Sequence, residues 1–317
     1  KRGSQKKQRN ILSVGEFFER HGGELGLSLH GSDVGFNRLI KEPTINRPGL
    51  ALAGFFTYFA FRRIQVIGNS ESSYLNSLRL EQRVKHFENL CNRNIPCIVV
   101  SRGKALPDEL IDIAEASGIS IFKTNMISMK FINAATIRLE WNFAPVTSEH
   151  GCMVDVQGIG VMVRGGSGAG KSECVLGLIE RGASLVADDI TRFRAIEVRE
   201  LIGSAPKAGR YHMEVRGLGI INVPALFGVA AMRVEKRLDL VVTLKPVEQA
   251  NDIERGGIRK KTYEILGIKI PHVELPVAPG RDMAGLVEVA ALDQKLKTFG
   301  HDSAVEFDKK LLKIMAE

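Results

Sequence analysis

The sequence predicts an α/β protein with two domains: an N-terminal α/β domain followed by a second domain built around a phosphate-binding loop. Three observations support this prediction. The chain has 317 residues, which is long enough for two domains that each bury a core of their own. Between residues 63 and 142, short β-branched runs alternate with longer amphipathic stretches, as in parallel strands joined by crossover helices. After residue 145, a glycine-rich turn stands between an apolar run and a helical pattern.

The first domain shows the alternation element by element. Its strands are predicted at residues 64–67, 97–100 and 119–122. Its helices are predicted at residues 73–90, 108–117 and 127–141. Pro107 and Asp108 open the second of these helices, because both residue types are typical of a helix start.

The net charge of +8 suggests a nucleic-acid partner, but a short tail carries most of it. Residues 1–10 contain five basic residues and no acid, which leaves a net charge of +3 for the rest of the chain. We expect this tail to be disordered. No motif of a DNA-binding family accompanies it, so the sequence predicts no nucleic-acid partner.

The cysteines and the apolar segments favour a cytoplasmic protein without a membrane anchor. The four cysteines show neither C-x-x-C spacing nor a dense framework, so they predict reduced thiols rather than a zinc site or a disulfide scaffold. The most apolar stretch, residues 48–61, is shorter than the roughly 20 residues that span a bilayer. We therefore expect it to form core or an interface.

The character of the chain changes near residues 142–146, where glycine-rich turns and paired strands replace the alternating pattern. The sequence thus predicts a tail over 1–10, an N-terminal domain over 11–142 and a C-terminal domain over 143–317. In the C-terminal domain, Pro246 ends an apolar strand that begins at residue 238. Two helices, 283–296 and 303–315, complete the domain.

Residues 165–172 fit the pattern G-x-x-x-x-G-K-S, after the apolar run 158–163 and before a helical stretch. Glycines let successive backbone N–H groups turn inward around phosphates, and the following helix presents its positive end to the same anion. Lys171 is expected to reach the terminal phosphates and Ser172 the Mg²⁺ ion. The predicted nucleotide-binding residues are Gly165, Gly166, Ser167, Gly168, Ala169, Gly170, Lys171 and Ser172.

Two further segments carry side chains suited to phosphoryl transfer. Asp188 and Asp189 end an apolar strand 17 and 18 residues after Lys171, and strand ends in such sheets face the ligand crevice. Because successive side chains point to opposite faces, one carboxylate is expected to address the incoming nucleophile and the other the phosphate lysine or a histidine. Glu214 and Arg216 share one face of an extended segment, where they pair structurally or serve a metal and a transferring phosphoryl group.

The segment 212–223 closely resembles the signature of the HPr kinase/phosphorylase family. Members phosphorylate a regulatory serine of the phosphocarrier protein HPr and remove the phosphate with inorganic phosphate, which yields pyrophosphate. The resemblance covers nearly the whole chain in the family's order: residues 45–50, 63–68, 148–151, 165–172, 187–189, 212–223 and 275–282.

The resemblance implies roles for particular residues. Lys171 becomes the phosphate-binding lysine, Ser172 and Glu214 become the Mg²⁺ contacts, and Asp188 becomes the acid/base group. The remaining catalytic residues that it implies are His150 and Asp189, which orient this network, and Arg255, which contacts transferred phosphate oxygens.

The resemblance also implies a setting for the reaction. It implies ATP as the phosphoryl donor, inorganic phosphate as co-substrate of the reverse reaction, a homohexamer, and control of carbon metabolism and sugar uptake. The C-terminal domain is expected to resemble the nucleotide-binding core of phosphoenolpyruvate carboxykinase.

Three positions depart from the family pattern. Gly166 stands where an acidic residue is usual, and Ala278 and Asp282 stand where lysine and asparagine are common. The last two make their segment less cationic, which bears on the grip on HPr and on phosphorolysis.

Two other functions remain open at the level of the sequence. A small-molecule P-loop kinase would need its own substrate pocket. An ATP-dependent regulatory switch would need the loop alone, but Asp188, Asp189 and Glu214 argue against it because a nucleotide sensor needs no base aimed at a second substrate.

Overall fold

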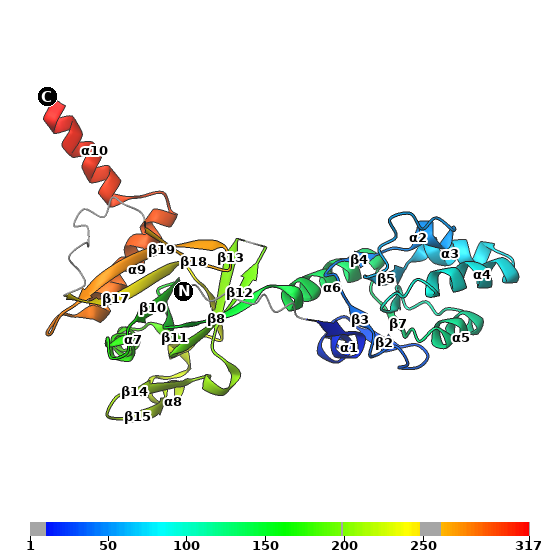
Figure 1. The fold of residues 1–317 in the computed structure, drawn as a ribbon, viewed down its shortest axis with the longest axis horizontal. Coiled ribbons are helices and arrows are strands. Elements are labelled where there is room, and N and C mark those ends of the chain that lie inside the picture. Colours follow the sequence, from blue (N-terminus) through cyan, green and yellow to red (C-terminus); the bar gives the residue numbers. More distant parts are fainter. Residues whose placement is uncertain (1–10, 198, 248–260, 317) are drawn as a thin grey trace, which may run out of the picture. The chain divides into compact units, whose positions relative to one another are not determined.

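The computed structural model describes residues 11–197, 199–247 and 261–316. The chain divides into two compact units, and the boundary along the chain lies between Ala144 and Pro145 (Figure 1). Both units combine sheets with helices, which confirms the predicted α/β class. The tail over residues 1–10 and Arg255 lie outside the described residues.

The first unit contains strands β1 to β7 and helices α1 to α6. The strands are β1 (Leu12–Ser13), β2 (Leu27–Leu29), β3 (Leu39–Ile40), β4 (Ile45–Asn46), β5 (Ile64–Ile67), β6 (Ile98–Val100) and β7 (Ile121–Thr124). The helices are α1 (Val14–His21), α2 (Gly49–Leu52), α3 (Asn69–Ser77), α4 (Leu80–Cys91), α5 (Asp108–Ala116) and α6 (Ser128–Phe143).

The first unit has three layers. Its five-stranded sheet has the order β2-β7-β6-β5-β4, in which β4 to β7 are parallel and β2 is antiparallel at the edge. Ile98 and Val100 pack on the face covered by α2 to α5, whereas Val99 packs on the face covered by α1 and α6. Strands buried on both faces explain the short apolar runs of the sequence.

The helix predicted over residues 73–90 is two helices in the structure. Leu78 and Arg79 are extended between α3 and α4, with ψ angles of 148° and 151°. The Ser77 hydroxyl donates to the carbonyl of Tyr74 at 2.7 Å, an alternative to continued helix that short polar side chains offer. The helical periodicity continues across this break, so it could not reveal the break.

The second unit contains strands β8 to β19 and helices α7 to α10. The strands are β8 (Val146–His150), β9 (Cys152–Val156), β10 (Ile159–Gly165), β11 (Ser184–Ala187), β12 (Ile190–Ile196), β13 (Glu200–Ser204), β14 (His212–Val215), β15 (Gly219–Asn222), β16 (Glu235–Arg237), β17 (Leu240–Pro246), β18 (Lys261–Ile265) and β19 (Ile268–Val277). The helices are α7 (Lys171–Glu180), α8 (Val223–Phe227), α9 (Met283–Thr298) and α10 (Ser303–Ala316), with short 3₁₀ turns η1 (Lys207–Gly209) and η2 (Val229–Ala231).

A six-stranded sheet with the order β11-β9-β10-β17-β19-β18 forms the centre of the second unit. One face packs against α7 and α9, and Figure 1 shows α7 beside β10 and β11. The other face packs against the four-stranded sheet β16-β13-β12-β8 through Phe193 and Leu201. Strands β10 and β17 are parallel, as are β17 and β19. Their carboxyl ends therefore meet at one edge of the sheet.

None of the helices in the described ranges combines the length and the hydropathy that a membrane span requires. The stretch 48–61 forms α2 and the loop after it, in which Ala51 and Leu52 are buried whereas Leu50 and Tyr58 are exposed.

We predict that Gly160→Ala destabilises the second unit. A Cβ at this position would overlap the backbone carbonyl of Arg237, because β10 approaches the end of β16 closely here. Forced overpacking of this kind costs about 1–3 kcal/mol. Calorimetric unfolding should show a lower midpoint for Gly160→Ala, whereas Gly209→Ala, at a glycine of the same unit with open space around it, serves as the control. Equal midpoints would contradict the prediction.

We also predict a pH-dependent contribution from Glu274, which bonds to Lys245 and Lys261 at 2.6 and 2.7 Å. These two lysines lower the pKa of Glu274 from its ordinary value of 4.5 to about 2. A lowered folded-state pKa stabilises the fold above the unfolded value, and the effect disappears as the pH falls through the folded one. Urea unfolding should therefore show Glu274→Gln less stable than the parent at pH 7, with the difference shrinking between about pH 4.5 and 2.

The control for this titration is Glu264→Gln on β18, because Glu264 is exposed and has no ion pair with another described residue. A stability difference for Glu274→Gln that stays constant from pH 7 to pH 2 would contradict the prediction.

Candidate active site

The phosphate loop joins the end of β10 to the start of α7. Gly168 and Gly170 have φ angles of 78° and 76°, a left-handed conformation that side chains other than glycine rarely adopt. The N–H of Ala169 donates to the carbonyl of Gly166 at 3.2 Å, which closes the loop. The loop and the first turn of α7 thus present backbone N–H groups and the positive end of a helix, the usual setting for a bound phosphate.

Lys171 is the first residue of α7 and is partly exposed. Its Nζ atom donates to the carbonyls of Gly165 and Gly166, at 3.3 and 3.1 Å. The ammonium group therefore lies over the loop itself, where a terminal phosphate would meet it.

The strand order brings an acid to the same edge. Strand β9 is antiparallel to both β10 and β11, so β10 and β11 run in the same direction. The residues that follow β11 therefore lie at the edge where the phosphate loop begins. Asp188 is the first of them.

Two groups hold the Asp188 carboxylate. The N–H of Glu214 donates to Oδ2 at 2.9 Å, and the Cys152 Sγ atom lies 3.0 Å from Oδ1 as a hydrogen-bond donor. Asp188 is thus fixed to β9 on one side and to β14 on the other.

A cavity of about 320 Å³ unites these elements. It contains the predicted loop residues from Gly168 to Ser172 and the three predicted acids. Its lining residues are Cys152, Gly168, Ala169, Gly170, Lys171, Ser172, Glu173, Asp188, Asp189, Glu214, Val215, Arg216, Gly217 and Gly219.

The β14–β15 hairpin supplies Glu214 and Arg216. Met213 and Val215 of the hairpin are buried in the core beneath α7, so the alternating side chains of Glu214 and Arg216 are exposed on the other face. A Cβ at Gly168 would lie 3.8 Å from Arg216 Nη2, which places this guanidinium beside the loop.

These groups fit a magnesium ion bound with a nucleotide. Ser172 and Glu214 line the same cavity and offer the oxygen ligands that Mg²⁺ prefers. Within the described ranges, no group of three or more His, Cys, Asp or Glu side chains is arranged so that it could hold a metal ion by itself. A site of this kind suits an ion that keeps several waters and takes its other ligands from phosphate.

Of the two predicted orienting residues, Asp189 lines the cavity and His150 does not. Asp189 lines the cavity with a φ angle of 55°, and its carbonyl accepts from the N–H of Gly151 at 2.7 Å. His150 ends β8 and is exposed, and its ring forms no hydrogen bond with another described residue. The predicted role of His150 as an orienting group stays a prediction, as does that of Arg255.

The structure shows the surroundings of the three positions that depart from the family pattern. Gly166 lies in open space. Asp282 caps the start of α9, where it accepts from the N–H of Gly285 at 2.9 Å, and it also pairs with Arg181 through both carboxylate oxygens at 3.1 and 2.8 Å. Ala278 lines a cavity beside the loop.

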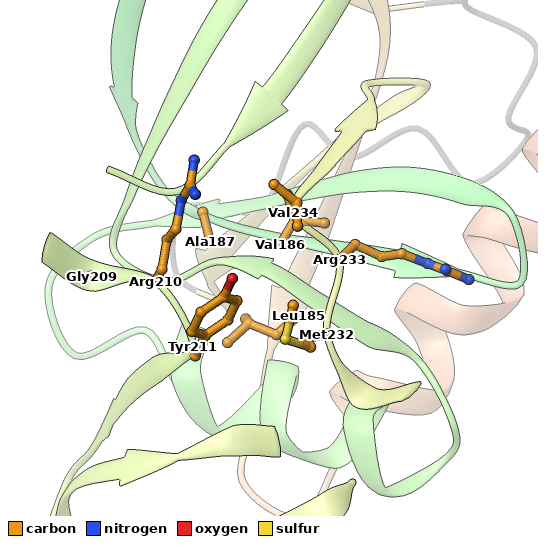
Figure 2. A pocket seen from close by; sticks show the side chains of 9 residues that line it. All are labelled: Leu185, Val186, Ala187, Gly209, Arg210, Tyr211, Met232, Arg233 and Val234. Carbon is orange, nitrogen blue, oxygen red and sulfur yellow. The ribbon is translucent and has the colours of Figure 1, made fainter. Parts of the chain in front are cut away.

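Another cavity lies against the middle of β11, but it is too small to bind a nucleotide. Its volume of about 10 Å³ has room for roughly one water molecule. Figure 2 shows Leu185 and Met232 side by side among its lining residues and the guanidinium of Arg233 pointing away from them. The phosphate-loop cavity is the candidate active site because it is lined by both the loop and the three predicted acids.

The sequence analysis did not identify Cys152 as part of the site. A single cysteine in an apolar strand carries no signal of its own, and its role depends on the register between β9 and β11.

Comparisons with known proteins match both units of the chain to one family. The family "HPr Serine kinase N terminus" matches residues 12–139, and "HPr Serine kinase C-terminal domain" matches residues 141–311. The chain is 40% identical over 306 residues to the HPr kinase/phosphorylase of Chloroherpeton thalassium, covering 96% of this chain and 90% of that protein. It is 37% identical over 294 residues to the HPr kinase/phosphorylase of Bacillus subtilis, covering 93% and 95%.

A solved structure, the Hpr(Ser) kinase/phosphatase from Coxiella burnetii, is 32% identical with a TM-score of 0.46, and the match covers 51% of this chain and 98% of that one. The two family matches leave few residues of the chain uncovered, and the relatives match over nearly their full length. The resemblance predicted from the sequence is thereby confirmed, and the chain belongs to the HPr kinase/phosphorylase family.

Proposed function

We propose that this protein transfers the terminal phosphate of ATP to the regulatory serine of HPr and removes it again with inorganic phosphate. One observation carries the proposal: the Asp188 carboxylate stands in the same cavity as the phosphate loop, fixed by two hydrogen bonds. A nucleotide sensor needs the loop but needs no base aimed at a second substrate. The names of the relatives support HPr as the acceptor.

In the forward direction, Asp188 accepts the proton of the serine hydroxyl as its oxygen attacks the terminal phosphorus. The bond between that phosphorus and the bridging oxygen breaks, and ADP leaves. Lys171 and the N–H groups at the start of α7 stabilise the charge on the phosphoryl oxygens. Arg216 lies beside Gly168 and supports the same charge from the hairpin.

In the reverse direction, Asp188 takes a proton from inorganic phosphate as one of the phosphate oxygens attacks the phosphoserine phosphorus. The bond from serine to phosphorus breaks, the serine oxygen recovers a proton from Asp188, and pyrophosphate leaves. Both directions need the same base and the same cations. One cavity therefore accommodates both reactions.

Magnesium is part of the proposal, with Ser172 and Glu214 as its protein ligands. When bound, the ion would neutralise phosphate charge as the phosphoryl group moves. Glu214 connects the ion to the base, because the backbone of the same residue holds Asp188.

The proposal includes a homohexamer that works in the cytoplasm. The four cysteines are free and buried, as expected of a protein that keeps its thiols reduced. Sedimentation of the purified chain at micromolar concentration tests the assembly.

We predict that Lys171→Ala and Asp188→Asn each abolish most of the transfer. The purified chain is mixed with Mg²⁺, HPr and ATP labelled in its terminal phosphate, after which excess inorganic phosphate is added. The parent should label the regulatory serine and then release labelled pyrophosphate. Loss of a general base lowers the rate by about 10²–10⁴-fold, so Asp188→Asn should transfer very little of the label. Its affinity for the nucleotide should be nearly unchanged, because the phosphate loop is intact.

The controls separate the alternatives. HPr that lacks its regulatory serine should stay unlabelled, and labelling of it would reject the proposed acceptor. ATP turnover that is independent of any protein acceptor would favour a small-molecule kinase. Full transfer by Asp188→Asn would remove the base from the mechanism.

A further inference from the structure

The Asp188 carboxylate has one hydrogen-bond donor at each oxygen. Oδ2 accepts from the backbone N–H of Glu214 at 2.9 Å, and Oδ1 lies 3.0 Å from Cys152 Sγ. A thiol that donates to an ionised carboxylate forms a stronger bond than a thiol that donates to a neutral acceptor. Both contacts together leave the carboxylate little freedom to rotate.

Cys152 is built into the sheet beneath the site. It is the first residue of β9, is 1% exposed, and pairs with Val163 just before the phosphate loop. Its side chain belongs to the core on which α7 packs. Its position is thus set by the same strands that position the loop.

The thiol remains a donor over the working pH range. Burial and the neighbouring Asp188 carboxylate raise the pKa of Cys152 far above its ordinary value. A neutral thiol of this kind is neither a nucleophile nor a metal ligand. Its remaining role toward Asp188 is that of a hydrogen-bond donor.

An irregularity in β11 creates the contact. Leu185 pairs with Val154, but Ala187 rather than Val186 pairs with Met153, so one extra residue is inserted. Leu185 faces the core under α7, whereas Val186 and Ala187 both face the opposite core. The shift returns Asp188 to the face of Cys152, where regular alternation would point it away.

We propose that Cys152 is a positioning residue for phosphoryl transfer: its thiol donates to Asp188 Oδ1 and fixes the orientation in which this carboxylate meets the serine hydroxyl of the substrate. The inference deepens the proposed function and rests on Asp188 as the acid/base group. Cys152 itself touches neither the nucleotide nor the acceptor in this role. It acts on the rate of transfer and leaves substrate binding to the loop and the hairpin.

Kinetics of Cys152→Val, Cys152→Ser and Cys174→Val test the inference. Valine fills the space without donating, and serine keeps a donor. Cys174 is a matched control, because it is a buried cysteine of the same core that lies outside the site cavity. We expect Cys152→Val to lower kcat for transfer to HPr about tenfold with both KM values within twofold, and we expect Cys152→Ser and Cys174→Val to stay within threefold of the parent.

A merely structural role predicts a different pattern. If serine lowers kcat as much as valine does, or if valine leaves kcat unchanged, the positioning role is overturned. Circular dichroism of each variant verifies its fold, and Cys152→Ser keeps the test decisive if Cys152→Val does not fold.

The infrared S–H stretch tests the hydrogen bond without reference to the reaction. The difference spectrum of the parent against Cys152→Ser isolates the Cys152 band from those of the other three thiols. We expect this band to move to higher frequency in Asp188→Asn, because the charged acceptor is lost. An unchanged band overturns the inference, whereas a shifted band together with full transfer by Asp188→Asn overturns the proposed function instead.

Discussion

The site depends on the register between β9 and β11. Between Leu185 and Ala187 this register shifts by one residue, and the shift turns Asp188 toward the face that carries the phosphate loop. A strand has a period of two, so a single inserted residue decides which face a side chain occupies. Without it, the carboxylate would point toward the second sheet, and the loop would have no base beside it.

Glu214 contributes to the site through both its backbone and its side chain. The N–H that holds Oδ2 belongs to Glu214, whose side chain is the proposed magnesium ligand. The hairpin that carries Glu214 and Arg216 is therefore connected to β11 at the point where chemistry is proposed. A movement of the hairpin would alter the metal ligand, the phosphate-facing cation and the hold on the base at once.

The sequence could predict what depends on short-range pattern. The phosphate loop, the acids after β11 and the parallel sheet of the first unit all follow from local spacing. Glu214 was a candidate from its own segment, and the family resemblance assigned it to Mg²⁺. The break between α3 and α4 was missed because hydrophobic periodicity continues through Leu78 and Arg79. Cys152 was missed for another reason. Its contact joins two residues that are 36 positions apart and depends on the register of their strands, which no local pattern encodes.

The structure adds to the sequence-based interpretation of the C-terminal segment by showing which groups surround Asp282. From the sequence, Asp282 in place of a neutral residue makes the segment less cationic and its hold on an anionic partner weaker. In the structure, the charge of Asp282 is paired with groups of the fold itself. The N–H of Gly285 and the Arg181 guanidinium lower the pKa of Asp282, so the carboxylate stays ionised and balanced by its neighbours. The Arg281 guanidinium donates to the carbonyl of Pro276 at 3.3 Å. The Asp282 charge is therefore balanced within the fold, whereas Ala278 is the position at which the segment lacks the lysine of the family pattern.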